Sequence, residues 1–474
     1  MPKEFTLKDF GEESQLVRRR IYVASFFMLF LLFLIVLRVF YLQVVMHDHF
    51  TTLSQHNRVK ILPIPPIRGL IFSQDGLLLA ENRPSFSLEL VPEQIDNPEE
   101  VINRLGKIIL IEEADISRFH GLLKKKRRFE SVPLRFKLDE NEVAQFAVNR
   151  HLFPGVDIKA RLNRHYPLST EIVHTIGYVG RIDEDDLKSI NASNYSGTNH
   201  IGKLGVEKAY EDILHGKVGY QQVEVNAQGR IIRVLDKTAP VPGKNLHLTL
   251  DISLQRAAVD ALRGKRGAIV AINPENGNVL AMVSSPGYDP NPFVNGIDEK
   301  SYKKLLLSKD TPLINRATQG KYPPGSTIKP FLGLIALETG VRHPVDETWC
   351  PGWYALKGNE HRYREWKKHG HGHADLKKAI TQSCDVYFYT LAYELGINRI
   401  HTGLRDFGFG QVTGIDIGGE VAALLPSRDW KSKTLGQAWY PGETLILGIG
   451  QGYMLASPLQ LANATATLAN HGKL

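Results

Sequence analysis

The most prominent apolar run of the chain lies close to its N-terminus. From Ile21 to Leu37 every residue except Ser25 is apolar or aromatic, and the apolar stretch continues to Val45, with Arg38 near its far end. About 20 such residues cross a bilayer as a helix, and a long side chain such as that of Arg38 can extend to the interface. The pattern predicts one transmembrane helix over residues 21–45.

The residues that flank this run predict its orientation. Arg18, Arg19 and Arg20 precede it directly, and such basic residues favour the cytoplasmic side. A cleaved signal peptide is the alternative, but the run is too long and no small-x-small cleavage site follows it. We therefore expect a cytoplasmic tail over residues 1–20, a single membrane anchor, and a body outside the cytoplasm.

Residues 46–245 alternate strand patterns with turn signals. Arg68–Phe72 and Leu77–Ala80 are typical of two strands, which the turn Gln74-Asp75-Gly76 connects. Helical periodicity is expected at about 97–109, 112–126 and 139–150, and in a short helix from Val206 to Leu214. The sequence of this half shows no nucleophile motif or metal motif, so we interpret it as a β-rich pedestal for binding, spacing or dimerisation.

A second unit is expected from residue 246 to residue 474. Gly267–Ile272 and Val279–Val283 flank a turn that contains Asn276-Gly277, which predicts a hairpin of mostly buried strands. Helical patterns follow at about 326–339, 375–381, 386–396 and 457–470. Strands followed by a block of helices predict an α/β or α+β domain in which helices pack on a sheet.

Composition and charge narrow the classes of partner. A hydrophobic content of 43% and a charged content of 23% are those of a folded protein. The net charge of +8 fits nucleic acid, a membrane surface or an anionic polymer such as cell wall. The basic run Lys124–Arg128 lacks an aromatic platform or a nucleic-acid motif, so we interpret it as a solvated surface and expect no nucleic-acid partner.

The first candidate for chemistry is the stretch from Ser326 to Lys329. Pro323, Pro324 and Gly325 precede it, which predicts that a helix begins here. A spacing of three places Ser326 and Lys329 on one helix face, within reach of each other. A serine becomes a good nucleophile when a base takes its proton. A lysine can act as that base when burial or a second cation favours its neutral form. A helix-capping serine beside an exposed lysine is the structural alternative.

A second element supports the catalytic interpretation. Ser383-Cys384-Asp385 lies between two helical patterns, and Asp385 alone could be only a helix cap. Together with Ser326 and Lys329, however, these residues match two of the motifs of penicillin-recognising serine enzymes. Further matching motifs occur along nearly the whole chain: Asn57-Arg58, Arg68-Gly69, Arg164–Pro167, His174–Tyr178, Gly202–Gly216, Trp366–Lys368 and Gly448–Gly452.

On these residues the chain resembles the class B penicillin-binding proteins, and Asp385 resembles their elongation-type subgroup, penicillin-binding protein 2. The resemblance implies a penicillin-recognising serine transpeptidase fold. It also implies D,D-transpeptidation of peptidoglycan during cell elongation, with D-Ala carboxypeptidase as a related hydrolase and protease activity. Ser326 would attack the D-Ala-D-Ala amide of a stem peptide, and β-lactams would acylate the same serine. Ser383 would relay a proton between Lys329 and the departing amine, and Asp385 would help to hold the substrate amide.

The resemblance also implies a place in the cell and a set of partners. The anchor would lie in the cell inner membrane and the body in the periplasm. The machinery that sets cell shape would supply the partners, a SEDS-family glycan polymerase and other elongation proteins. No cofactor is needed for this chemistry.

The third motif of the family, Lys-Ser/Thr-Gly, does not occur in the sequence up to Leu474. We therefore expect a truncated or partial sequence in which the transpeptidase domain lacks its C-terminal part. Two other functions stay open at this point. One is a catalytically inert scaffold that binds elongation partners, and the other is a β-lactam sensor or β-lactamase, which the large pedestal disfavours.

Four potential metal ligands surround the second motif: Cys350, Glu365, His371 and Cys384. Two thiolates, an imidazole and a carboxylate suit a tetrahedral zinc ion, although the spacings match no compact finger motif. A Cys350–Cys384 disulfide and a pair of inert buried thiols are the alternatives. The zinc would be structural and would hold the Ser383–Asp385 loop, and His369 and His373 are nearby substitutes for His371.

Overall fold

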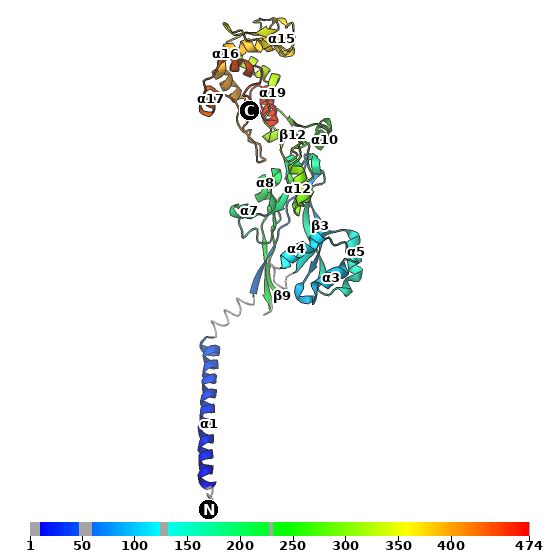
Figure 1. Cartoon of the computed structure of the whole chain (residues 1–474), viewed down its shortest axis with the longest axis vertical. Coiled ribbons are helices and arrows are strands. Elements are labelled where there is room, and N and C mark those ends of the chain that lie inside the picture. Colours follow the sequence, from blue (N-terminus) through cyan, green and yellow to red (C-terminus); the bar gives the residue numbers. More distant parts are fainter. Residues whose placement is uncertain (1–9, 47–58, 124–130, 227–230, 474) are drawn as a thin grey trace, which may run out of the picture.

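The computed structural model of the chain describes residues 10–46, 59–123, 131–226 and 231–473. The basic run Lys124–Arg128 and the pair Asn57-Arg58 lie outside these residues. Figure 1 shows the order of the parts along the chain: an N-terminal helix, a β-rich pedestal, and a head in which helices predominate.

The N-terminal helix α1 (Phe10–Phe40) starts before the apolar run and continues into a π-helical turn, η1 (Tyr41–Val45). The stretch Val17–Val45 is long and apolar enough to cross a membrane, and its large hydrophobic side chains are exposed to solvent in the isolated chain. A helix with apolar side chains on all sides and no protein core around it fits a lipid environment.

The pedestal is built around one long strand, β3 (Leu78–Leu90). Its first part pairs with β2 (Ile71–Phe72), and its second part pairs with β4 (Val132–Leu138) on one side and β5 (Val156–His165) on the other. Three helices pack on this second part around a shared apolar core: α3 (Pro98–Leu105), α4 (Glu113–Leu123) and α5 (Glu140–Asn149). A separate antiparallel sheet consists of β1 (Val59–Ile64), β8 (Gly219–Val225) and β9 (Ile231–Thr238).

A buried ionic cluster joins distant segments of the pedestal. The Glu207 carboxylate, fully buried in α8 (Gly205–Ala209), accepts from Arg164 Nε at 2.7 Å, from Arg68 Nε at 2.8 Å and from Tyr166 Oη at 3.1 Å. Arg68 also pairs with Glu211 of α9 (Glu211–His215) at 2.7 Å. Burial disfavours the charged carboxylate, but the two guanidinium groups hold the pKa of Glu207 below its ordinary value. The motifs at 68, 164–167 and 202–216 are therefore parts of one interaction.

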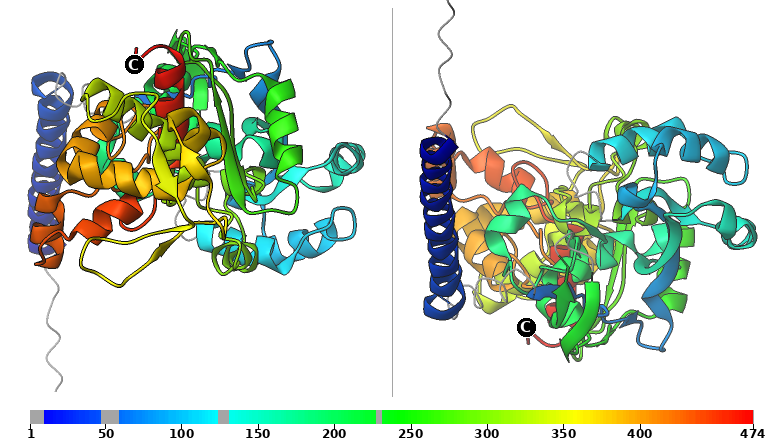
Figure 2. Two further views of the ribbon diagram at one scale, coloured as in Figure 1. Left: turned by 90° about the horizontal axis from the view of Figure 1, so that it is seen from above. Right: turned by 90° about the horizontal axis from the view of Figure 1, so that it is seen from below.

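The head starts with α10 (Ile252–Ala261) and an antiparallel hairpin of β11 (Gly267–Ile272) and β12 (Val279–Ser285). The helical block that follows holds the largest apolar core, to which α14 (Lys329–Glu338) and α16 (Asp385–Asp406) contribute. Figure 2 shows these helices, coloured yellow to red, grouped beside the green segments. A second core contains residues from both sides of position 246, such as Ile71, Leu79, Met282 and Ala317.

The structure corrects two details of the predicted elements and confirms a third. The hairpin was expected to be mostly buried, but every residue of β11 is only half-buried, because β11 pairs with β12 alone among the described strands. The helix expected over about 386–396 does end at Gly396, whose non-helical backbone (φ 72°) separates it from a second helix within the range of α16. The single helix expected from Val206 to Leu214 is divided at Tyr210 into α8 and α9.

The buried cluster leads to a stability prediction. In Glu207→Gln, two buried guanidinium groups lose their shared counter-ion, so we expect the free energy of unfolding to fall by about 3–5 kcal/mol. Because the pKa of Glu207 lies below its ordinary 4.5, the carboxylate stabilises the fold above that pH and loses this effect as the pH falls. The difference in free energy of unfolding between E207Q and the parent protein should therefore become smaller at acidic pH.

Chemical unfolding of the full-length protein, followed at pH 7 and at pH 4, measures both effects. Glu275→Gln is the matched control, because Glu275 is exposed in the turn between β11 and β12. An E207Q variant as stable as E275Q at pH 7 would contradict the prediction.

Candidate active site

Ser326 lies on a tight turn that precedes a buried helix. The 3₁₀ turn η5 (Gly325–Ile328) leads directly into α14, and Ile328 anchors the turn in the core of the head. Gly325 has a φ of 61° and donates its N–H to Gly450 O at 2.8 Å. A Cβ atom at Gly450 would lie 2.1 Å from Gly325 O, so the 448–452 loop needs a glycine to support the turn. Ser326 itself is exposed.

Ser383 is held at the junction of two helices. It follows α15 (Leu376–Thr381), and α16 begins at Asp385. The backbone of Ser383 has a φ of 53°, an uncommon conformation for a residue other than glycine. Such strain persists only where surrounding contacts hold it. Trp366 supplies two of these contacts, because its Nε1 donates to Gln382 O at 3.3 Å and to Ser383 O at 3.2 Å.

The four predicted catalytic residues meet in one hydrogen-bonded chain. Ser383 Oγ donates to Ser326 Oγ at 2.9 Å, and Lys329 Nζ donates to Ser383 Oγ at 3.0 Å. The same ammonium donates to Ser383 O at 3.0 Å and to Asp385 Oδ1 at 2.6 Å. A proton can pass along this chain between an exposed hydroxyl and a buried amine.

The order of the chain differs from the expectation based on spacing. We expected Lys329 to reach Ser326 directly from the same helix face. The hydrogen bonds that the structure shows for Lys329 Nζ go instead to Ser383 and Asp385, because the Asp385 carboxylate attracts the buried ammonium. Ser383 therefore connects Lys329 to Ser326, and the Asp385 carboxylate contacts the lysine.

Burial controls the charges at this site. Lys329 is 1% exposed, and its ammonium lies 5.4 Å from the centre of the Phe388 ring. Burial raises the pKa of Asp385, while the hydrogen bond and the charge of Lys329 oppose that shift. The protonated form of Asp385 is consequently more accessible here than in water, because burial disfavours its charge.

The four candidate metal ligands also come together. One ligand atom from each of Cys350, Glu365, His371 and Cys384 lies within 4.8 Å of all the others, and all four residues are buried. Glu365 Oε2 is central: it lies 3.4 Å from each Sγ atom and 3.8 Å from His371 Nδ1. The alternatives at position 371 do not enter this cluster, because His369 and His373 are exposed.

Burial and local hydrogen bonds act on the charges of this cluster. Both cysteines are free thiols, so the disulfide is not formed. Burial raises the pKa of the Cys384 thiol. Burial also opposes the charge on Glu365, yet the N–H groups of Val386 and Asp385 hold the pKa of that carboxyl below its ordinary value. Val386 N donates to Glu365 Oε2 at 3.0 Å, which ties the cluster to the first turn of α16.

Two contributors to the site were not singled out by the sequence. In the sequence, Trp366 and the 448–452 loop were recognised only as parts of matching motifs, and no role in the site was predicted for them. The available signal for Trp366 was its position next to the candidate metal ligand Glu365.

Comparison with known proteins defines the class first. A model of the penicillin-binding protein dimerisation domain matches residues 63–248, and a model of the penicillin-binding protein transpeptidase domain matches residues 267–474. With the Ser326–Ser383–Lys329 chain in place, these matches define a penicillin-binding protein with a serine transpeptidase domain.

Full-length relatives narrow the class to one family. Peptidoglycan D,D-transpeptidase MrdA of Acinetobacter baumannii is 45% identical over 472 residues, which cover 100% of this chain and 70% of that protein. The protein of the same name from Escherichia coli strain K12 is 42% identical over 476 residues, which cover 100% of this chain and 75% of that protein. The chain belongs to the MrdA family of penicillin-binding proteins.

Two solved structures share the fold. Penicillin-binding protein PBP2 of Helicobacter pylori in complex with MreC has a TM-score of 0.76 and 32% identity, over 87% of this chain and 78% of that one. A chain from a peptidoglycan synthase complex, described as coordinating polymerization and crosslinking, has a TM-score of 0.68 and 32% identity, over 95% of this chain and 77% of that one.

Proposed function

We propose that this protein is a peptidoglycan D,D-transpeptidase that cross-links stem peptides during cell elongation. The observation that carries the proposal is the hydrogen-bonded chain from exposed Ser326 through Ser383 to buried Lys329 and Asp385. The names of the relatives support it, because each is a D,D-transpeptidase. They do not favour the inert-scaffold alternative. Carboxypeptidase, hydrolase and protease activity have no support of this kind and stay predictions.

The geometry gives each residue a role in acyl transfer. Ser326 Oγ attacks the carbonyl carbon of the D-Ala-D-Ala amide while its proton moves to Ser383 Oγ, whose own proton moves to a neutral Lys329 amine. Asp385 lies 2.6 Å from that nitrogen and holds it beside Ser383. The amide C–N bond then breaks, and the proton returns through Ser383 to the departing D-Ala nitrogen.

The second half of the reaction uses the same chain in reverse. The amine of a neighbouring stem peptide attacks the acyl-Ser326 ester and loses its proton through Ser383, and Ser326 regains a proton as the ester C–O bond breaks. β-Lactams acylate Ser326 by the first half alone, because their ring amide takes the place of the D-Ala-D-Ala amide.

Labelling with a fluorescent penicillin tests the roles of the two serines. Ser326→Ala should abolish the labelled band, because the bond forms to Ser326 Oγ. Ser383→Ala should keep the band but slow its appearance by about 10²- to 10⁴-fold, the usual value of a positioned proton-transfer group. Thr327→Ala and Thr381→Ala are matched controls, because each hydroxyl donates only to the backbone carbonyls of its own turn. Unchanged labelling of S326A would overturn the proposed function.

We also infer that Cys350, Glu365, His371 and Cys384 bind a structural zinc ion. Tetrahedral zinc with usual bond lengths keeps its ligand atoms about 3.3–3.8 Å apart, and a cluster within 4.8 Å needs only small rotations to reach that geometry. The ion would fix Cys384 between Ser383 and Asp385. The ligands serve stability and positioning here, and no step of the acyl transfer passes through the metal.

Elemental analysis and thermal unfolding test the zinc site. The full-length protein should contain about one zinc per chain, and Cys384→Ser should lose it and unfold at a lower temperature, because a serine hydroxyl is a poor zinc ligand. His373→Ala is the matched control, because His373 is exposed and pairs with Glu347 at 3.2 Å outside the cluster. Parent protein that is purified without chelators and lacks stoichiometric zinc would contradict the inference.

Finally, we propose that α1 anchors the protein in the inner membrane with its N-terminus in the cytoplasm, and that a SEDS-family polymerase is its partner there. Arg18–Arg20 support the orientation, and the similar chain in a peptidoglycan synthase complex supports the partner.

A reporter active only in the periplasm should work when fused after Val45 and fail when fused to the N-terminus. The polymerase should co-purify with the full-length protein, and it should be lost when an unrelated membrane helix replaces α1.

A further inference from the structure

Three exposed tryptophans gather on one small segment of the head. The segment from Thr348 to Ala374, here called the flap, contains two antiparallel pairs: β13 (Thr348–Cys350) with β16 (Gly372–Ala374), and β14 (Trp353–Tyr354) with β15 (Tyr363–Arg364). Its tryptophans are 60% (Trp349), 39% (Trp353) and 66% (Trp366) exposed, and they are three of the five in the chain. Large aromatic side chains left in solvent in this way mark a binding surface.

The inward residues of the flap account for its packing without these tryptophans. In β13, Thr348 and Cys350 are buried while Trp349 between them faces outward. In the second pair, Tyr354 and Tyr363 pack on Tyr389 of α16, with ring centres 6.3 and 5.7 Å apart. None of the three tryptophans belongs to the apolar core of the head, so core packing does not explain their exposed faces.

The exposed charges of the flap are almost all positive. Glu360 is the one exposed carboxylate between Thr348 and Ala374, and the exposed cations are Lys357, Arg362, Arg364, Lys367 and Lys368. The Arg362 guanidinium lies 4.3 Å from the centre of the Trp353 ring, and Arg364 pairs across the strands with Trp353. An aromatic face and two cations therefore lie side by side on the exposed part of this strand pair.

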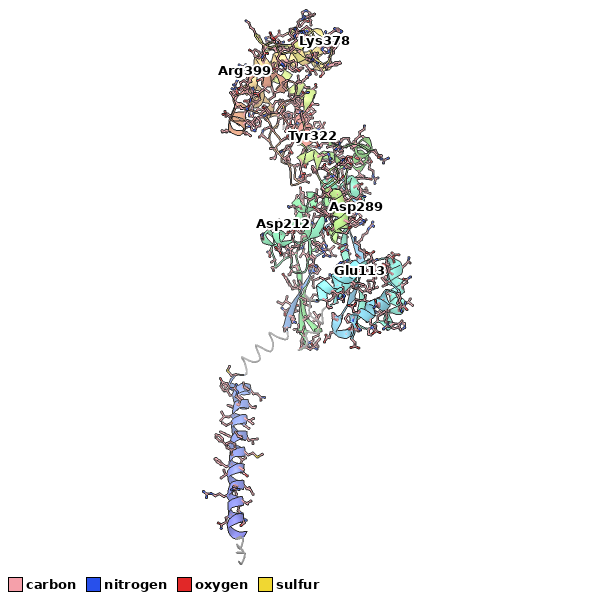
Figure 3. The ribbon with its side chains drawn as sticks, in the orientation of Figure 1. Glu113, Asp212, Asp289, Tyr322, Lys378 and Arg399 are labelled. Carbon is pink, nitrogen blue, oxygen red and sulfur yellow. The ribbon has the colours of Figure 1, made fainter. Side chains whose placement is uncertain are left out.

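The flap contacts the catalytic chain through Trp366. Trp366 Nε1 donates to Ser383 O at 3.2 Å, and Ser383 Oγ donates to Ser326 Oγ at 2.9 Å. In Figure 1 the flap and α15 lie at the end of the body opposite β9, and Figure 2 shows its yellow segment extending as a long loop from the head. Lys378, labelled at this end in Figure 3, donates to His371 O at 2.9 Å and holds the base of the flap.

We propose that the flap is a binding subsite for the glycan strand of uncross-linked peptidoglycan, next to Ser326. The proposal rests on the proposed function. Sugar rings present apolar C–H faces that pack on indole rings, and the carboxylates of the stem peptides complement the flap's cations. Such a subsite would hold a polymeric substrate while one of its stem peptides enters the catalytic chain, raising the local concentration of that peptide. A membrane surface is the less favoured occupant. The sheet of β1, β8 and β9 contains the first strand after the membrane-length helix, and the flap lies at the opposite end of the body.

Binding of three probes to the full-length protein in detergent tests the subsite. The probes are un-cross-linked glycan strands with stem peptides, a neutral β-1,4-linked hexamer of N-acetylglucosamine, and the free stem pentapeptide. We expect Trp353→Ala to weaken binding of the strands about tenfold and of the neutral hexamer measurably, and Arg364→Ala to weaken binding of the strands alone. Tyr393→Ala is the matched control, because Tyr393 is 53% exposed on α16 outside the flap.

The outcomes separate this proposal from the proposed function. Penicillin labelling is measured on each variant, and a labelled parent with S326A unlabelled keeps the proposed function whatever the flap does. Glycan binding by W353A and R364A equal to that of Y393A would overturn the subsite. A loss confined to the free pentapeptide would overturn it as well. Trp366→Phe serves as a second variant, because it keeps an aromatic face and removes the N–H donor. Lower strand cross-linking with retained strand binding would identify Trp366 as a positioning residue for Ser383.

Discussion

The Lys329 ammonium is 1% exposed, so protein groups must replace the water around its charge, and this requirement organises the head. Removing one charge from water costs several kcal/mol unless partners surround it. Lys329 obtains a carboxylate from Asp385, a hydroxyl and a carbonyl from Ser383, and the face of the Phe388 ring. These partners all come from the first turn of α16 and the residues just before it. The charge therefore fixes the start of α16 against the start of α14, and this places Ser383 beside Ser326.

The same constraint explains why so much structure surrounds one short loop. Ser383 has a positive φ, which costs on the order of 1–3 kcal/mol unless neighbouring contacts impose it. The indole of Trp366 holds the loop through two backbone carbonyls, and the Glu365 carboxylate accepts from Val386 N behind it. Cys384 is buried against Glu365 from within the loop. Cys384, a candidate metal ligand, thus lies in the chain between the two candidate catalytic residues Ser383 and Asp385.

Sequence patterns predicted the parts that depend on local periodicity or composition, and the full-length relatives support the family they indicated. The membrane-length helix, the β11–β12 hairpin and the turn at Ser326 are of this kind. The direction of the Lys329 side chain could not be predicted in the same way, because Asp385, far along the chain, decides it electrostatically. The motifs at 68, 164–167 and 202–216 were recognisable as motifs, yet the sequence did not show that Glu207 of the third motif pairs with the arginines of the other two. Spacing describes neighbours on one element, whereas buried charge pairs residues across elements.

A shared apolar core connects the pedestal to the head. The Glu207 cluster holds the segment just before β2, the strand β5 and the helix α8 together, and the core beside it includes Ile71 and Tyr166 from the pedestal with Met282 and Ala317 from the head. Ala317 belongs to α13 (Arg316–Gln319), the last helix before the Ser326 turn. Apolar burial on both sides of the junction disfavours free rotation of one part on the other, which small polar interfaces permit.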